Sequence, residues 1–139
     1  MLIGEYEHTL DPKGRMIFPA KLREELGESF VLTRGLDGCL FVYSILEWKL
    51  LEEKVRSLPM SKTRDLQRFL FASAVQVEPD KQGRILIPQN LRRHAGLQKD
   101  AVVIGASVRA EIWDREKWEA LCENLTEDSI AQTMEELGF

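Results

Sequence analysis

DPKGRMIFP spans Asp11–Pro19, and DKQGRILIP spans Asp80–Pro88. Each stretch reads Asp, two variable residues, Gly-Arg, three apolar residues and Pro, and the second begins 69 positions after the first. The same offset relates three further pairs: Leu22 and Leu91, Arg23 and Arg92, and Gly27 and Gly96. A fixed offset over so many positions indicates a long internal repeat.

Length and composition set limits on what the repeat builds. The chain has 139 residues, of which 44% are hydrophobic and 30% charged, as in ordinary soluble globular proteins. A half of roughly 70 residues buries too little surface to be stable alone. We therefore expect the two repeats to complete each other in a single domain over residues 1–139.

The sequence gives no sign of export, membrane insertion or disulfide bonding. No apolar run approaches the roughly 20 residues of a membrane helix, and the start MLIGEYEHTL lacks a signal-peptide pattern. Cys39 and Cys122 fall at unrelated places in the two repeats, which disfavours a disulfide or a thiolate metal site. We expect a cytoplasmic protein with two small, buried or half-buried cysteines.

Charge is unevenly distributed along the chain. The net charge is −4, but residues 111–139 hold 9 acids and 2 bases, whereas residues 1–110 hold 17 bases and 14 acids. Positive charge concentrates around the two motifs, each with a single Asp: Lys13, Arg15, Lys21 and Arg23 in the first, and Lys81, Arg84, Arg92 and Arg93 in the second. For Lys21, Arg92 and Arg93, a solvated face of a small helix remains a reasonable interpretation.

Each motif is predicted to lie at the tip of a β-hairpin. Strand-like segments precede the motifs at 3–10 and 74–79 and follow them at 15–18 and 84–87. An Asp that opens a turn bonds its own backbone, and a Gly accepts the left-handed conformation that closes it. The turn therefore needs the Asp and the Gly, but it does not need the Arg.

The remaining elements also recur in both halves. Pro19 and Pro88 suit the first turns of short helices at 20–26 and 89–95, which end at glycines. Strand pairs are expected at 30–35 with 39–44 and at 101–106 with 110–114, each followed by a helix capped by Ser44 or Asp114. Four aromatic residues at matching places are expected to pack helix on sheet: Tyr43, Trp48, Trp113 and Trp118.

The two repeats differ in their tails. The predicted repeats cover about 1–58 and 75–125, with a linking helix at about 61–73 and an acidic C-terminal helix at about 127–137. Ile130, Met134 and Leu137 form one apolar stripe on that last helix. The spacing leaves open whether the stripe packs within the chain or on a neighbouring subunit.

Together with HAGLQKDAVVIGA (94–106) and EIWDREKW (111–118), the paired motifs resemble the MraZ family of bacterial transcriptional regulators, which is related to the AbrB and SpoVT DNA-binding domains. The resemblance implies an α+β fold, a swapped-hairpin β-barrel built from the two repeats of one chain. It also implies a homo-oligomer, often ring-like, that binds short repeats in double-stranded DNA upstream of its own gene. In many bacteria the gene of such a protein heads a cell-division and cell-wall cluster, so the resemblance implies a nucleoid-associated repressor of that cluster.

The resemblance also assigns DNA contacts. It marks Lys13, Arg15 and Arg84, with Lys81 as a phosphate contact. Asp11 and Asp80 would orient the Arg four residues on, and Gly14 and Gly83 would complete the turns. Gln82 replaces Lys13 in the second copy, partly offset by Lys81 where the first has Pro12, which puts an equal contribution of the two motifs in doubt. In the structural alternative, each Arg merely pairs with the Asp of its own turn.

The sequence also bears on two other function classes, an enzyme and an interaction protein. An enzyme is not expected, because His8 and His94 lie in unrelated contexts and no metal-ligand or phosphate-loop spacing is present. We accordingly expect no cofactor, metal or small-molecule substrate. The alternative is a swapped-hairpin interaction protein of the antitoxin type that acts through its C-terminal helix.

Overall fold

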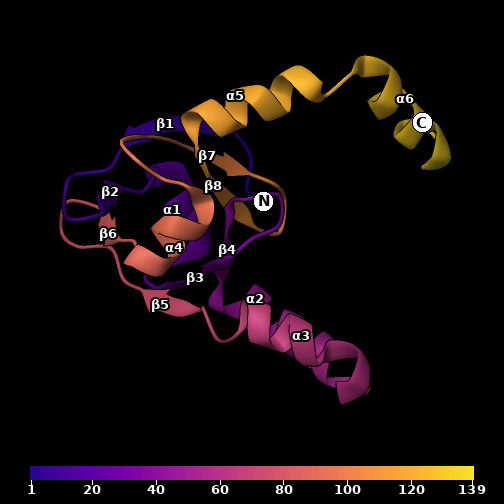
Figure 1. Cartoon of the computed structure of the whole chain (residues 1–139), viewed down its shortest axis with the longest axis horizontal. Helices are drawn as coiled ribbons and strands as arrows, with labels where there is room; N and C mark the ends of the chain where they lie inside the picture. Colours follow the sequence, from indigo (N-terminus) through magenta and orange to yellow (C-terminus); the bar gives the residue numbers. More distant parts are fainter.

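The computed structural model describes all 139 residues and shows an α+β architecture of eight strands and six helices (Figure 1). In chain order the elements are β1 (Glu5–Thr9), β2 (Arg15–Ile17), α1 (Ala20–Leu26), β3 (Phe30–Arg34), β4 (Leu40–Ser44), α2 (Ile45–Arg56), α3 (Met60–Leu70), β5 (Val75–Val77), β6 (Arg84–Leu86), α4 (Gln89–Ala95), β7 (Asp100–Gly105), β8 (Ala110–Asp114), α5 (Arg115–Asn124) and α6 (Glu127–Glu136).

Six strands form one antiparallel sheet in the order β1-β7-β8-β4-β3-β5. Exchanging the repeats reverses this order, because β1, β7 and β8 are the counterparts of β5, β3 and β4. The first strand of each repeat pairs with the other repeat: Tyr6 lies opposite Val103, and its counterpart Val75 lies opposite Leu32. Neither repeat completes this sheet alone.

The motif strands β2 and β6 form a separate antiparallel ribbon in which Met16 lies opposite Ile85. The predicted hairpins are therefore correct for the turns and wrong for the strands. The first turn is closed by a bridge between Leu10 and Met16, but β1 and β2 form no further ladder. Instead, β1 pairs with β7 and β2 pairs with β6, both in the other repeat.

The expected barrel is not closed. The main sheet ends at β1 on one side and β5 on the other. The ribbon strands hydrogen-bond mainly to each other, so no continuous ladder runs around the core. The fold is an open antiparallel sheet with the ribbon set over its core.

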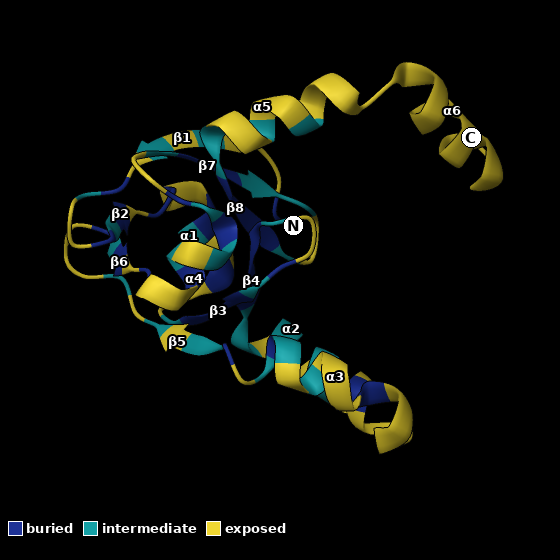
Figure 2. Cartoon of the chain, viewed as in Figure 1, coloured by how far each residue is buried: buried dark blue, intermediate teal, exposed yellow.

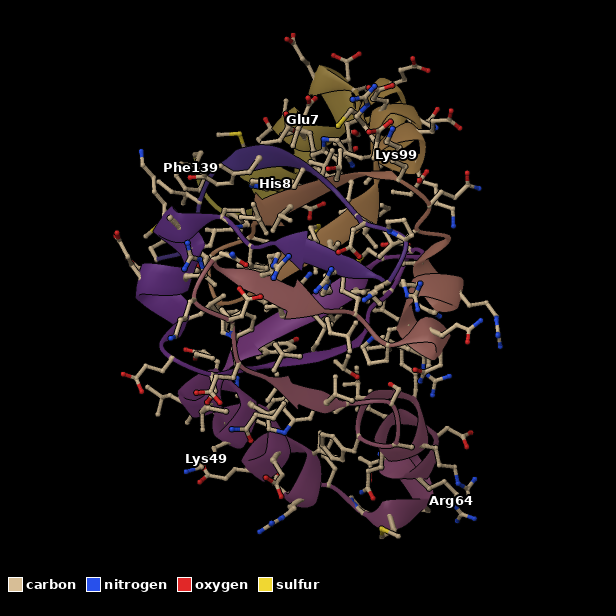
Figure 3. The ribbon with its side chains drawn as sticks, turned by 90° about the vertical axis from the view of Figure 1, so that its left-hand side faces the viewer. Glu7, His8, Lys49, Arg64, Lys99 and Phe139 are labelled. Atoms are coloured by element: carbon tan, nitrogen blue, oxygen red, sulfur yellow. The ribbon has the colours of Figure 1, made fainter.

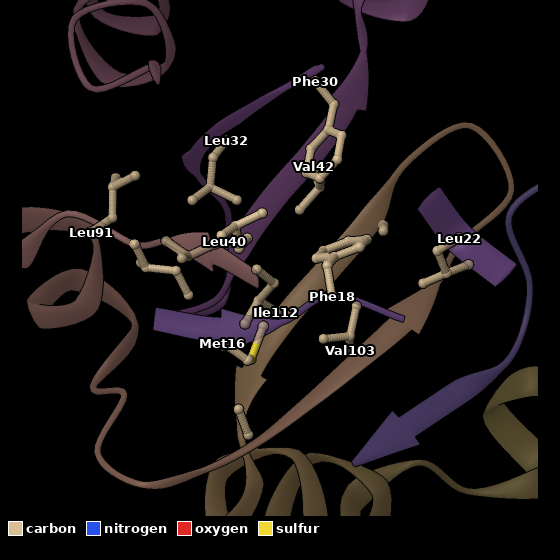
Figure 4. Close-up of a cluster of buried hydrophobic side chains, with 14 of the residues drawn as sticks. Met16, Phe18, Leu22, Phe30, Leu32, Leu40, Val42, Leu91, Val103 and Ile112 are labelled. Carbon is tan, nitrogen blue, oxygen red and sulfur yellow. The ribbon is translucent and has the colours of Figure 1, made fainter. Parts of the chain in front are cut away.

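The main core lies between the sheet, the ribbon and helices α1 and α4 (Figures 2 and 4). The ribbon strands and the residue that follows each of them contribute four apolar side chains that are at most 1% exposed: Met16, Phe18, Ile85 and Ile87. Leu22 of α1 and Leu91 of α4 add to them at matching positions. Burial of both motif strands in one core fixes the position of the two turns relative to each other.

The longer helices begin as the sequence predicts. The Ser44 hydroxyl accepts a hydrogen bond from the Glu47 N–H at 3.1 Å, and the Asp114 carboxylate accepts one from the Lys117 N–H at 3.3 Å. Pro19 and Pro88, however, lie one position before α1 and α4 rather than in their first turns. None of the helices is both long and apolar enough to cross a membrane.

The predicted aromatic anchors pack helix on sheet. The Trp48 ring on α2 lies 5.8 Å from the Tyr43 ring on β4, and the Trp118 ring on α5 lies 5.7 Å from the Trp113 ring on β8, as centroid distances. The strand rings Tyr43 and Trp113 are buried, and the helix rings Trp48 and Trp118 are half-buried. Cys39 is buried beside these rings, as expected. Cys122 is exposed, so the expectation that it is buried or half-buried is wrong.

Helix α6 projects from the rest of the chain (Figures 1 and 2). Every one of its residues is exposed. The apolar stripe is exposed with it, at 48% for Ile130, 45% for Met134 and 71% for Leu137. The spacing left open whether the stripe packs within the chain or on a neighbouring subunit, and the structure shows that it does not pack within the chain.

Candidate nucleic-acid interface

The first motif turn is built by the side chain of Asp11. One carboxylate oxygen accepts hydrogen bonds from the backbone N–H groups of Lys13 and Arg15, both at 2.9 Å. The Gly14 N–H donates to the Asp11 carbonyl at 2.9 Å, and Gly14 has a φ of +86°. Aspartate therefore closes the turn, and glycine supplies the left-handed backbone, as the motif predicts.

The second turn repeats this geometry. Asp80 accepts from the N–H groups of Gln82 and Arg84, both at 2.9 Å, and Gly83 has a φ of +79°. Both turns are thus the same structure. The replacement of Lys13 by Gln82 leaves the backbone unchanged and removes one charge, because the residue at this position contributes only its N–H to the turn.

Each motif Arg is held by the Asp of its own turn. Arg15 Nε donates to Asp11 at 2.7 Å, and Arg84 Nε donates to Asp80 at 2.9 Å. The ion pairs of the structural alternative are therefore present. They use only Nε, however, and no hydrogen bond or ion pair of the protein uses the terminal Nη atoms of either guanidinium. Both side chains remain about a third exposed, at 36% and 33%.

The two aspartates are stable anions at neutral pH. Hydrogen bonds from the backbone N–H of Arg15, followed by the side chain of the same residue, hold the pKa of Asp11 below its usual range. The corresponding groups of Arg84 lower the pKa of Asp80 in the same way. Each carboxylate therefore stays charged and orients its guanidinium.

The ribbon brings both arginines to one surface. Side chains on a strand alternate between its two faces. Because Met16 and Ile85 point into the core, Arg15 of β2 and Arg84 of β6 both point outward. Figure 3 looks onto the side of the molecule where this ribbon lies, with the two strands next to each other. The turns stand at opposite ends of the ribbon, since β2 and β6 are antiparallel.

Arg23 and Arg92 belong to the same surface, a role that the sequence did not reveal. Arg23 Nε donates to the Phe18 carbonyl at 2.9 Å, and its Cζ would lie 2.8 Å from a Cβ placed on Gly83. Arg92 makes the equivalent bond to the Ile87 carbonyl and covers Gly14. Each helix thus extends an Arg over the turn of the other repeat.

The interpretation of Arg92 as part of a solvated helix face is therefore wrong. Its side chain is half-buried against the opposite turn. Lys21 and Arg93 are exposed, as a solvated face requires. Repetition in the sequence distinguishes Arg92 from Lys21. Arg92 has Arg23 as its counterpart at the repeat offset, whereas Lys21 has Asn90.

The two turn lysines complete the positive surface. Lys13 and Lys81 are exposed, and no side-chain hydrogen bond or ion pair of the protein uses either ammonium group. With the four arginines, they make a cationic face that is centred on the ribbon. We call it the ribbon face, defined by β2, β6 and the side chains of Lys13, Lys81, Arg23 and Arg92.

The histidines and cysteines lie outside the ribbon face. His94 bonds the Gly35 carbonyl at 3.0 Å, and burial lowers the pKa of His8. Burial raises the pKa of the Cys39 thiol to about 12, so that no thiolate forms at neutral pH. No cluster of three or more His, Cys, Asp or Glu side chains is arranged to hold a metal ion.

Comparison with known protein families identifies the repeat. The family described as "MraZ protein, putative antitoxin-like" matches the chain twice, over residues 1–69 and 70–138. The chain belongs to the MraZ family. The two MraZ matches together cover almost all of the sequence, and each contains one Asp-x-x-Gly-Arg turn.

Individual MraZ proteins match over their full length. Proteins named "Transcriptional regulator MraZ" from Caldicellulosiruptor bescii and Acetivibrio thermocellus are 58% and 57% identical over 143 aligned positions, which cover 100% of both chains. The protein of the same name from Caldanaerobacter subterraneus is 62% identical over 121 positions, covering 86% of this chain and 85% of its own.

Proposed function

We propose that this chain is a sequence-specific DNA-binding transcriptional regulator that binds double-stranded DNA through its ribbon face. The observation that carries the proposal is the pair of arginines, Arg15 and Arg84, on one ribbon with their Nη atoms free. An Arg fork bonds phosphate or the O6 and N7 atoms of guanine, and a two-stranded ribbon fits the major groove. The name of the full-length relatives supports the same function.

The side chains of the ribbon face take different roles in this proposal. Arg15 and Arg84 contact bases or phosphates, and Lys13 and Lys81 contact phosphates. Asp11 and Asp80 hold the arginines, as the 2.7 and 2.9 Å ion pairs indicate. Gly14 and Gly83 form the turns and leave room for the Arg of the opposite helix. Gln82 replaces Lys13 in the second turn and Lys81 replaces Pro12, so each turn offers one lysine to phosphate, but from a different position.

We further propose that the chain works as a homo-oligomer, ring-like in form, on short repeats upstream of its own gene. Each neutralised phosphate contributes a salt slope of only about −0.9, so a few cations on one subunit give modest affinity. Several subunits on successive DNA repeats gain affinity through effective concentration. Such an assembly would lie in the cytoplasm, associated with the nucleoid, and would repress transcription of the cell-division and cell-wall gene cluster.

The exchange of strands supports a finer description of the fold. We propose that it is an open variant of the swapped-hairpin barrel of AbrB and SpoVT proteins, with repeats of about 1–58 and 75–125. In support, β1 and β2 pair with β7 and β6 of the other repeat, and β5 pairs with β3. Both turns are then parts of one binding unit.

A gel-shift titration tests the proposal. DNA from upstream of the protein's own gene is titrated at several salt concentrations with wild type, the Arg15→Ala/Arg84→Ala variant and a matched control, Arg56→Ala/Arg68→Ala. The control removes two exposed, ion-paired arginines from α2 and α3. We expect salt-sensitive binding by wild type and control and loss of specific binding by the motif variant, with unchanged circular dichroism. Equal binding by all three proteins removes the motif arginines from the site.

Helix α6 favours a second candidate, an interaction protein of the antitoxin type. A 10-residue helix is marginal in water without a partner, and α6 leaves its apolar stripe uncovered. The two candidates differ in one measurement, made with a variant that lacks residues 127–139. If that variant binds DNA like wild type but no longer regulates a reporter, a partner of α6 carries part of the function.

A further inference from the structure

Two exposed aliphatic side chains lie on the ribbon face between the motif arginines. Ile17 of β2 is 45% exposed and Leu86 of β6 is 56% exposed. In the ribbon register, Arg15 lies opposite Leu86 and Ile17 lies opposite Arg84. The four side chains therefore form a small rectangle on the outer face, with an Arg and an aliphatic group alternating at its corners.

The fold does not account for these aliphatic groups. About half of each side chain is open to solvent, whereas the neighbouring ribbon residues Met16 and Ile85 are buried in the core. They also occupy matching positions in the two repeats, two residues after each motif Arg, as the printed sequence shows. An exposed apolar pair that recurs in the middle of a cationic surface matches a ligand that is both anionic and locally apolar.

Charge determines which ligand fits. A second copy that docked through the same face would bring Arg15 and Arg84 against their own counterparts, which like-charge repulsion disfavours. Duplex DNA has the complementary charge, and its major groove is wide enough for a two-stranded ribbon. Within that groove the only apolar group on a base edge is the C5-methyl group of thymine.

We propose that Ile17 and Leu86 contact thymine methyl groups in the major groove and thereby help to select the operator sequence. This inference rests on the proposed DNA-binding function. Alternate residues on a strand are about 6.7 Å apart, close to two base-pair steps of about 3.4 Å. Ile17 therefore reaches a thymine about two steps from the contact of Arg15, and Leu86 does the same from Arg84.

The pseudo-two-fold arrangement of the ribbon adds a geometric consequence. Met16 lies opposite Ile85, its own counterpart, so the local two-fold axis passes between these two residues. The contacts of Ile17 and Leu86 are related by that axis. The selected thymines therefore lie on opposite DNA strands, on either side of the centre of the bound segment.

Replacement of thymine by uracil isolates the methyl contact, because it removes the C5-methyl group and keeps the base-pairing edge. Upstream DNA containing thymine and the same DNA containing uracil are titrated by fluorescence anisotropy with wild type, Ile17→Ala/Leu86→Ala, and a matched control. The control, Leu36→Ala/Val108→Ala, shortens two loop aliphatics that are 62% and 51% exposed. All three proteins are first compared by circular dichroism.

We expect wild type and control to bind uracil DNA about 15-fold more weakly than thymine DNA, at about four-fold for each methyl group buried. The Ile17→Ala/Leu86→Ala variant is expected to bind both DNAs equally, at about the affinity of wild type for uracil DNA. Should the double variant fold poorly, Leu86→Ala alone is expected to leave a ratio of about four.

Two results overturn the inference while leaving the proposed function intact. One is wild-type binding that differs by less than two-fold between thymine and uracil DNA. The other is a folded Ile17→Ala/Leu86→Ala variant that keeps the wild-type ratio. A wild-type protein that binds neither DNA overturns the proposed function, and this inference with it.

Discussion

Replacement of Gly83 by alanine is expected to lower the free energy of unfolding by about 2–3 kcal/mol. Gly83 has a φ of +79°, and a Cβ there would lie 2.8 Å from the Cζ atom of Arg23. The left-handed backbone costs a residue with a Cβ about 1–2 kcal/mol. Moving the guanidinium aside also breaks the hydrogen bond from Arg23 Nε to the Phe18 carbonyl, which contributes about 1 kcal/mol.

Thermal unfolding followed by circular dichroism measures this loss. A chain of this size loses about 3 °C of Tm per kcal/mol, so Gly83→Ala is expected to melt about 6–9 °C below wild type. Gly38→Ala is the matched control, because Gly38 has a similar φ of +81° but meets only Lys117 Nζ, at 3.8 Å. The control has only the backbone cost and is expected to lose about 3–6 °C.

A double-mutant cycle then assigns the difference to Arg23. In an Arg23→Ala background, Gly83→Ala is expected to cost only the backbone strain, about 1 kcal/mol less than in wild type. Two results would show that Arg23 does not stabilise the turn of the other repeat. One is an equal decrease in Tm for Gly83→Ala and Gly38→Ala. The other is a difference between these two decreases that persists in the Arg23→Ala background.

Three further predictions concern the core, the turn aspartates and the C-terminal helix. Phe18→Ala truncates a fully buried side chain and is expected to lower the free energy of unfolding in urea by about 3–5 kcal/mol. Leu36→Ala, at an exposed position, is expected to lower it by less than about 0.5 kcal/mol. Equal losses would contradict the placement of the core. Because the folded pKa values of Asp11 and Asp80 lie below the unfolded value, their stabilisation is present above the unfolded pKa of about 4 and is lost as the pH falls through the folded values. The Tm of wild type should therefore exceed that of Asp11→Asn/Asp80→Asn near neutral pH and approach it in acid; a constant difference would refute the shift. Deletion of residues 127–139 should leave the Tm of the chain unchanged, since α6 is wholly exposed, and should strengthen binding to nonspecific DNA by removing acidic groups. Unchanged nonspecific affinity would show that the acidic segment does not discourage such binding.

The turns were predictable from the sequence because their chemistry is local. An Asp four residues before the Arg and a Gly between them specify the turn that is observed at both Asp11 and Asp80. The helix starts at Ser44 and Asp114 also follow from local capping chemistry. These features depend on neighbours within a few residues along the chain.

Partners that are distant in sequence were not predictable in this way. The alternating pattern of β1 predicts a strand but carries no information that β7, and not β2, pairs with it. Arg92 lies in a charged segment that is typical of a solvated helix face, and only the folded chain places its side chain over Gly14. For α6 the periodicity predicts the helix and its stripe but not what covers them.

The central claim is that both repeats present an arginine to the same DNA. Fluorescence anisotropy on upstream DNA, with Arg15→Ala, Arg84→Ala and the double variant at one salt concentration, tests it most directly. Because an Arg contact contributes about 1–3 kcal/mol, each single variant should bind roughly 5- to 150-fold more weakly than wild type, and the double variant more weakly than either. If either single variant binds like wild type, only one repeat contacts the DNA, and the claim of a shared interface is wrong.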